Sequence, residues 1–370
     1  MHLADLDTGR VRFRTSPDVF DDLRAACEVN PDIAEFEVIG ESEEGRPIAG
    51  VTLGYGPRLV TLVAGAHADE PVGPETLRHL ILHGLGSRDW GAEAGGLGEL
   101  FERVTLRIVP HANPDAEARN EPWISRWDDL SDDPAAMLAL FLETRRREPP
   151  GRDVEFGYPA MRPENRSVTD FLFAPGPQLA LHASLHGMAF SEGALLLIEK
   201  RWLHDPEAEP LREGFRRAAE AAGLRLHDHD RGGDKGFRYG GPGFWSTPEG
   251  AAMRAHFEAA GDAQTAALFH RSSMEQAIHA SGGQPLCVVT ELPLFHLAKA
   301  YGHEPGRAAL AEEFREALPA LLRHATEADR SARLGEAVER FGIRLIDPTL
   351  GVGLHLQVLD LALEVSLVAA

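Results

Sequence analysis

The sequence predicts an α/β protein: a single domain with a mixed, largely parallel central sheet flanked by helices. Apolar runs of strand length, such as Leu59–Ala64, Val104–Val109 and Pro285–Thr290, alternate with segments of helical periodicity. No internal repeat and no long linker divides the 370 residues. We therefore expect one domain over residues 1–370.

The charge of the chain excludes some classes of partner. The 37 basic and 58 acidic residues give a formal net charge of -21. Such a field repels nucleic acid and argues against a polyanionic substrate. The charge is spread along the chain, which is typical of a well-solvated surface.

The two cysteines, Cys27 and Cys287, both lie in apolar surroundings, as free core thiols do in a reducing compartment. The first residues lack the basic start and apolar core of a signal peptide. Polar residues interrupt the apolar tail over residues 353–370, so we expect no membrane span. Together these features predict a cytoplasmic location.

The first elements of the chain are a helix and two strands. Ser16 can start a helix with Phe20, Leu23 and Cys27 on one face. Strands are expected over residues 36–39, 48–53, 178–185 and 193–198, and helices over residues 134–147, 206–223, 249–259 and 263–279. A glycine-rich connection covers residues 84–98, and a glycine-rich, aromatic loop covers residues 227–248.

The turn after the strand Leu59–Ala64 is the first candidate site. Gly65 gives the backbone room to turn, and Pro71 suits the first position of a helix. His67 and Glu70, two strong metal-ligand types, lie three residues apart in this turn. In open α/β sheets, loops at the carboxyl ends of strands commonly build the functional site.

Polar residues follow other strands in the same way. Asn113 follows Val104–Val109, His186 follows residues 178–185, and Glu291 follows Pro285–Thr290. His67, Glu70 and His186 together would form a two-histidine, one-carboxylate zinc site with an open fourth position. Zinc in such a site activates water and polarises a substrate carbonyl. His182 falls inside the apolar run, where we expect a structural role.

In these residues the sequence resembles the zinc carboxypeptidases of the M14 peptidase family. The resemblance covers about residues 37–295 and rests on five motifs in the family's order. They are His67–Glu70 for HxxE, Asn113–Asp115 for the NPD turn, Asn165–Arg166 for the Asn-Arg pair, His186 for the third zinc ligand, and Glu291 for the glutamate at the end of a strand.

The resemblance implies a role for each of these residues. His67, Glu70 and His186 would bind one Zn²⁺ per chain. Glu291 would act as the general base and pass the proton to the leaving amine. Arg166, helped by Asn165, would bind a substrate carboxylate through parallel hydrogen bonds. Asp69 has no assigned role, and we expect its side chain to face away from the metal.

The sequence departs from the family's pattern in several places. The family's second arginine, which stabilises the carbonyl oxygen, has two candidates here, Arg119 and Arg126, and we favour Arg119. No tyrosine precedes Glu291 at the family's position; Tyr239 could substitute for it or be an ordinary loop residue. Residues 121–161 form an insertion that could cover the cleft and select small substrates, and residues 330–370 form a C-terminal extension.

Three functions remain open. The first is a metallocarboxypeptidase that removes the C-terminal residue of a small peptide with a free carboxylate. The second is a deacylase or amidase acting on an N-acyl amino acid or a cell-wall fragment. The third is a non-catalytic zinc-binding protein of the same fold. The sequence contains no HExxH, GxSxG or GxxxxGK motif for other chemistries.

Overall fold

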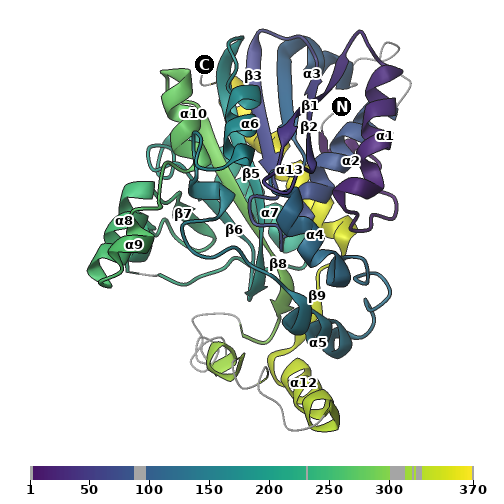
Figure 1. Ribbon diagram of the computed structural model, residues 1–370, viewed down its shortest axis with the longest axis vertical. Helices are drawn as coiled ribbons and strands as arrows, with labels where there is room; N and C mark the ends of the chain where they lie inside the picture. The colour runs from purple at the N-terminus through teal and green to yellow at the C-terminus, as the bar shows by residue number, and fades with distance from the viewer. Residues whose placement is uncertain are drawn as a thin grey trace.

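One mixed sheet forms the centre of the protein (Figure 1). The computed structural model describes residues 3–86, 97–230, 232–300, 313–318, 321 and 327–368. Within them, nine strands form the sheet in the order β1-β2-β4-β3-β5-β8-β6-β7, and β9 pairs with β8. The strands are β1 (Ala34–Glu41), β2 (Pro47–Leu53), β3 (Arg58–Ala64), β4 (Val104–Val109), β5 (Gln178–Ser191), β6 (Leu195–Ile198), β7 (Phe244–Ser246), β8 (Leu286–Leu297) and β9 (Ile343–Leu345).

The four central strands, β4, β3, β5 and β8, are parallel, while the pairs β1·β2, β2·β4, β6·β8 and β8·β9 are antiparallel. β3 and most of β5 are buried on both faces, because helices cover both sides of the central strands. Their carboxyl ends meet at one edge of the sheet. The predicted α/β class with a mixed, largely parallel sheet is therefore confirmed.

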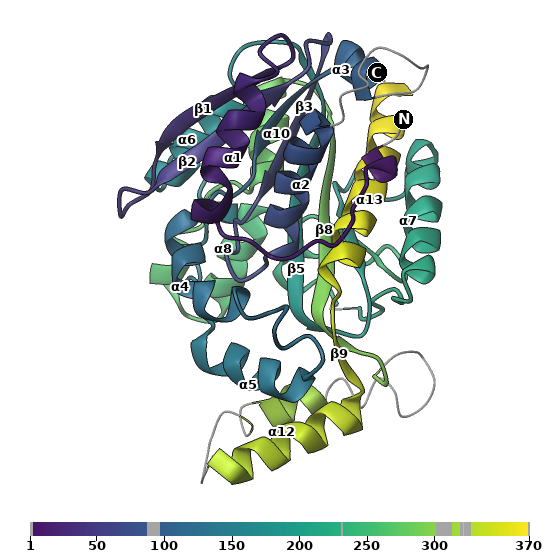
Figure 2. The same ribbon diagram turned by 90° about the vertical axis from the view of Figure 1, so that its right-hand side faces the viewer.

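Helices cover both faces of the sheet (Figures 1 and 2). One face carries α1 (Ser16–Glu28), α2 (Val72–Gly86), α7 (Glu209–Ala221) and α13 (Pro348–Val368). The other face carries α6 (Pro163–Leu172) and α10 (Ser273–Ser281). The remaining described helices are α3 (Leu97–Arg103), α4 (Pro114–Ile124), α5 (Pro134–Thr144), α8 (Gly250–Ala259), α9 (Ala263–Ala266) and α12 (Glu327–Phe341).

The long helix α13 is part of the core. It packs against α2, α7 and the strands β5 and β8. Its length and apolar composition would be sufficient to cross a membrane, but 61% of its most apolar 18 residues are buried inside the protein. Burial of this kind is typical of a core helix, which is apolar all round because neighbours surround it. Cys27 and Cys287 are free, buried thiols, as expected.

The structure differs from the prediction most at strand and helix ends. β5 and β8 continue to Ser191 and Leu297, well beyond the predicted ends, because they pair with each other as far as Ser191 and His296. The predicted helix over residues 263–279 is divided into α9 and α10. The helices α3, α4, α6 and α13 were not anticipated. Residues 87–96 of the predicted glycine-rich connection lie outside the described residues.

Candidate metal centre

The turn between β3 and α2 has the conformation that the sequence predicts. Gly65 has a φ of +72°, and a Cβ there would lie 2.6 Å from the ring of His111. Gly73, in the first turn of α2, allows that helix to approach β5, since a Cβ would lie 2.2 Å from the carbonyl oxygen of Leu185. These two glycines bring the turn that carries His67 and Glu70 against the strand that carries His186.

The three predicted ligands converge. His67 Nδ1 lies 3.1 Å from Glu70 Oε1 and 3.2 Å from His186 Nδ1. His186 Nδ1 lies 2.9 Å from Glu70 Oε2, which also accepts a hydrogen bond from the backbone N–H of Gly187 at 3.2 Å. One potential ligand atom from each of these three residues lies within 4.8 Å of the others. We call this group the triad.

The electrostatics of the triad favour a positive charge. Burial lowers the pKa of His67, but the charge of Glu70 and the hydrogen bond to it outweigh this effect and raise the pKa to about 9. Burial raises the pKa of Glu70, but His67 and His186 together bring it well below its usual range. A field that attracts protons to two imidazoles would also stabilise a dication. Two imidazole nitrogens and a carboxylate are a donor set suited to zinc, so the residues present fit this metal.

Glu291 lies beside the triad. On β8 it is the register partner of His186 on β5. Neighbouring strands are about 4.8 Å apart, and paired residues of parallel strands direct their side chains to the same face. The register therefore places the Glu291 side chain next to that of His186. Both residues lie within long strands and not at strand ends, which differs from the prediction.

The predicted insertion contributes two carboxylates to the site. A short 3-10 helix, η2 (Val154–Phe156), packs Val154 against β3 and the following turn in an apolar cluster with Val63 and Ala66. Its N-cap, Asp153, is half-buried, and its charge interacts with that of His67. Glu155 Oε2 lies 3.3 Å from His186 Nε2. Sequence reasoning missed both residues, although two carboxylates only two residues apart could have indicated a functional site.

The insertion also brings an arginine to the triad turn. Arg145, the C-cap of α5, donates from Nε to Asp69 Oδ2 at 2.6 Å, and its Nη2 lies 2.5 Å from the same oxygen. Its guanidinium carbon lies 4.9 Å from the centre of the Phe141 ring. Asp69 is thus engaged by Arg145, and its orientation relative to the metal stays a prediction.

The structure does not bring the other predicted arginines to the triad. Arg119, on α4, is exposed and pairs with Glu44 and with Glu148. Arg126 pairs with Asp129 and is also exposed. The carboxylate partners of both arginines lie outside α4, at Glu44, Glu148 and Asp129.

The Asn-Arg pair has a different placement from the predicted one. Asn165 is completely buried on α6 and donates from Nδ2 to the carbonyl oxygen of Val154 at 2.6 Å. Arg166 follows it in the helix and is exposed to solvent. Asn165 therefore supports the backbone of η2, and the binding of a substrate carboxylate by Arg166 stays a prediction.

Two further predicted features, the NPD turn and Tyr239, form hydrogen bonds with other residues. Asn113 caps α4 by accepting a hydrogen bond from Ala116 N, and Asp115 accepts hydrogen bonds from Ser42 and Arg46. The NPD turn thus secures the start of α4. The Tyr239 hydroxyl donates to Asp228 within its own loop.

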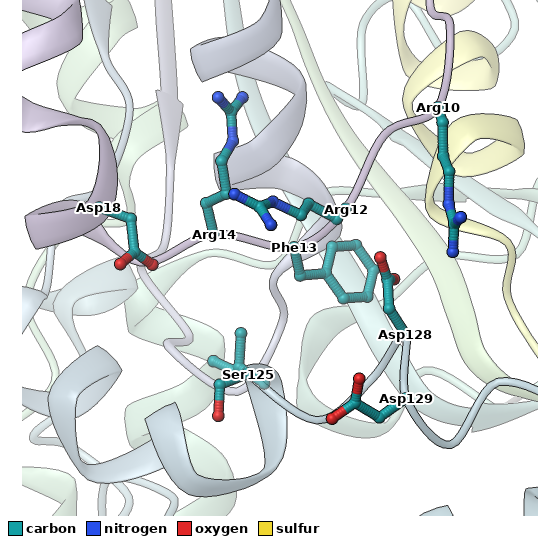
Figure 3. A pocket seen from close by; sticks show the side chains of 9 residues that line it. Arg10, Arg12, Phe13, Arg14, Asp18, Ser125, Asp128 and Asp129 are labelled. Atoms are coloured by element: carbon teal, nitrogen blue, oxygen red, sulfur yellow. The ribbon is translucent and has the colours of Figure 1, made fainter.

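A separate cavity of about 650 Å³ lies between the N-terminal segment and the α4–α5 connection (Figure 3). It is lined by Arg10, Arg12, Phe13, Arg14, Asp18, Ile124, Ser125, Asp128 and Asp129. Three arginines and three aspartates are among the lining residues, so their formal charges balance. No triad residue lines this cavity.

Comparisons with known proteins agree with the fold. Residues 20–126 match the family model of the M14 peptidases, described as zinc carboxypeptidase. Zinc carboxypeptidase A 1 of Drosophila melanogaster is 31% identical over 101 residues, which are 25% of this chain and 22% of that protein. The chain thus matches about a fifth of the length of this curated relative.

Two solved structures are similar to the whole chain. Carboxypeptidase A from Helicoverpa armigera has a TM-score of 0.50 at 14% identity, over 99% of this chain and 77% of that chain. A metallo-carboxypeptidase from Burkholderia cenocepacia has a TM-score of 0.49 at 16% identity, over 95% and 70%. The family match confirms the predicted resemblance to the zinc carboxypeptidases, and the H. armigera enzyme confirms the fold. The matched residues include His67 and Glu70 but not His186 or Glu291.

Proposed function

We propose that this protein is a zinc-dependent hydrolase of amide bonds and that it removes the C-terminal residue from a small peptide. The observation that supports the proposal best is the convergence of His67, Glu70 and His186, with Glu291 in register beside His186. A zinc ion held by these three residues would supply a Lewis acid and a reactive water at neutral pH.

The chain's own residues would complete the reaction. Glu291 would accept the proton of the attacking water and deliver it to the nitrogen of the leaving amine. One carboxylate can perform both transfers because it is protonated after the first and restored by the second.

Arg145 would stabilise the negative charge that develops on the carbonyl oxygen. Its ion pair with Asp69 holds it beside the turn that carries two of the ligands. A fixed cation lowers the barrier most where the charge appears only in the transition state. We therefore assign to Arg145 the role that the sequence suggested for Arg119.

A deacylase or amidase is the second candidate, and the placement of Arg166 favours it. That arginine is exposed on α6, and its partner Asn165 is used to support η2. If no described arginine anchors a C-terminal carboxylate in the predicted way, the substrate need not be a peptide with a free C-terminus. The cytoplasmic location stays a prediction in either case.

A panel of matched substrates separates these two candidates. A dipeptide with a free carboxylate, its C-terminal amide and an N-acyl amino acid would each be incubated with the zinc-loaded protein. Hydrolysis of the free dipeptide, with at least about 100-fold lower kcat/KM for the amide, supports the carboxypeptidase. Equal cleavage of dipeptide and amide, or cleavage of the acyl amino acid alone, contradicts the carboxypeptidase. No hydrolysis of any of the three contradicts both candidates.

A further inference from the structure

The imidazole of His186 is held from both sides. Its Nδ1 faces the other triad residues, 2.9 Å from Glu70 and 3.2 Å from His67. Its Nε2 lies 2.8 Å from Ser184 Oγ and 3.3 Å from Glu155 Oε2. The side chains of His186 and Glu155 are both buried, so water does not compete for these contacts.

Glu155 is itself fixed in place. Ser273 donates from its hydroxyl to Glu155 Oε1 at 2.9 Å, and its backbone N–H donates to the same oxygen at 3.4 Å. Ser184 donates to Oε2 at 3.5 Å. Three structural elements therefore hold one carboxylate: η2 carries it, α10 binds one of its oxygens, and β5 binds the other.

These contacts indicate that His186 would bind a metal through Nδ1. A ring that binds a metal through Nδ1 carries its proton on Nε2. That N–H is directed toward Ser184 Oγ and the Glu155 carboxylate, both of which can accept it. A buried carboxylate behind a ligating histidine fixes the ring orientation and makes the other nitrogen a stronger ligand.

We infer that Glu155 is a positioning residue for the metal centre, which orients His186 and strengthens its binding to zinc through a hydrogen bond to Nε2–H. The inference rests on the metal site of the proposed function. Glu155 itself does not contact the substrate in this assignment, because its carboxylate oxygens are engaged by His186, Ser184 and Ser273. The predicted insertion thus contributes to the metal centre itself.

The test is the zinc affinity of three proteins, measured by competition with a chromogenic chelator. Glu155→Gln keeps the shape of the side chain and removes its charge, and Glu155→Ala removes the hydrogen bond as well. We expect the zinc Kd to rise by about 10- to 100-fold in Glu155→Ala, with a smaller rise in Glu155→Gln. Thermal unfolding in EDTA reports whether each variant folds, and the near-isosteric glutamine variant tests the inference if the alanine variant does not.

A matched control is available in the same fold. Glu192 and His227 are both buried, and Glu192 Oε1 lies 2.5 Å from His227 Nδ1. Neither residue is in the triad. Glu192→Gln therefore changes an equivalent Glu–His pair, and we expect its zinc Kd to stay within about twofold of the wild-type value.

The outcomes separate the inference from the proposed function. If the wild-type protein binds no stoichiometric zinc, the proposed metal site fails. If the wild-type protein binds zinc, and every folded Glu155 variant including Glu155→Gln has a zinc Kd within twofold of the wild-type value, only the inference fails. An equal loss of affinity in Glu155→Gln and Glu192→Gln also overturns it, because the effect would then be general. A loss confined to the Glu155 variants supports it.

Discussion

Arg145 and Arg119 differ in their surroundings although both are arginines close to carboxylates. Arg145 is largely buried and binds Asp69 inside the triad turn, whereas Arg119 is exposed and pairs with Glu44. Exposed ion pairs contribute about 0–1 kcal/mol, so Arg119 has little effect on its surroundings. The difference makes a direct prediction about catalysis.

Replacing Arg145 by alanine should lower kcat/KM by about 100-fold or more, because a fixed donor to the developing negative charge would be lost. Arg119→Ala should keep kcat/KM within about twofold. Steady-state kinetics on the best substrate of the panel measures both. Comparable losses in the two variants, or a larger loss in Arg119→Ala, would contradict the assignment of Arg145.

Single residues show how far the sequence could predict this site. His67, Glu70, His186 and Glu291 were found because each follows a strong strand signal. Arg145 could not be found, since it follows a helix in the insertion and only the packing of α5 brings it to Asp69. Asn165 and Arg166 were assigned from a dipeptide, and a dipeptide does not report that α6 turns one side chain inward and the other outward.

At the scale of elements, the contact between α2 and β5 decides whether the triad forms. Glu70 lies two residues before the start of α2, and His186 lies in β5. Gly73 lies at this contact, and a Cβ there would be only 2.2 Å from the Leu185 carbonyl oxygen. Backbone atoms on that side cannot rotate away as a side chain could.

Gly73→Ala should therefore destabilise the protein by about 1–3 kcal/mol, as overpacking does, and should also weaken zinc binding. Gly353→Ala is the control, because nothing beyond the neighbouring backbone of α13 lies within 4 Å of its Cβ position. That variant should be stabilised by about 0.5–1 kcal/mol through the better helix propensity of alanine. Urea unfolding of both variants in EDTA provides the comparison. A Gly73→Ala protein as stable as wild type would show that α2 can move away from β5.

Elements with clear periodicity or unbroken apolar runs were predicted close to their observed bounds, as β3 and β4 show. Their lengths were less predictable where pairing extended a strand, since the continuation of β5 to Ser191 depends on its partner β8. The helix α13 was missed because an apolar segment interrupted by polar residues has no distinct face when neighbours surround it on all sides.

At the scale of the whole molecule, several histidines are buried as neutral groups. Burial lowers the pKa of His182 from 6.5 to about 4, and that of His111 to about 4. His182 Nδ1 lies 2.9 Å from Thr61 Oγ1. The unfolded chain binds protons at these residues between pH 6.5 and 4, and the folded protein does not.

The stabilising contribution of these two neutral rings should therefore be complete above about pH 6.5 and should fall as the pH decreases toward 4. His182→Gln removes one such group, so its unfolding free energy should depend less steeply on pH in this window. The measurement is urea unfolding in EDTA at several pH values, where one unit of pKa depression corresponds to about 1.4 kcal/mol. An identical slope for wild type and His182→Gln would contradict the neutral, buried state of this ring.

The central claim is that the triad and Glu291 form one hydrolytic centre, and the most direct test is the Glu291→Gln variant loaded with zinc. Metal content by elemental analysis and hydrolysis of the best substrate should be measured on the same sample. We predict one zinc per chain, as in wild type, with kcat lower by at least about 100-fold because the general base is lost. A variant that retains zinc and hydrolyses the substrate at the wild-type rate would contradict the claim.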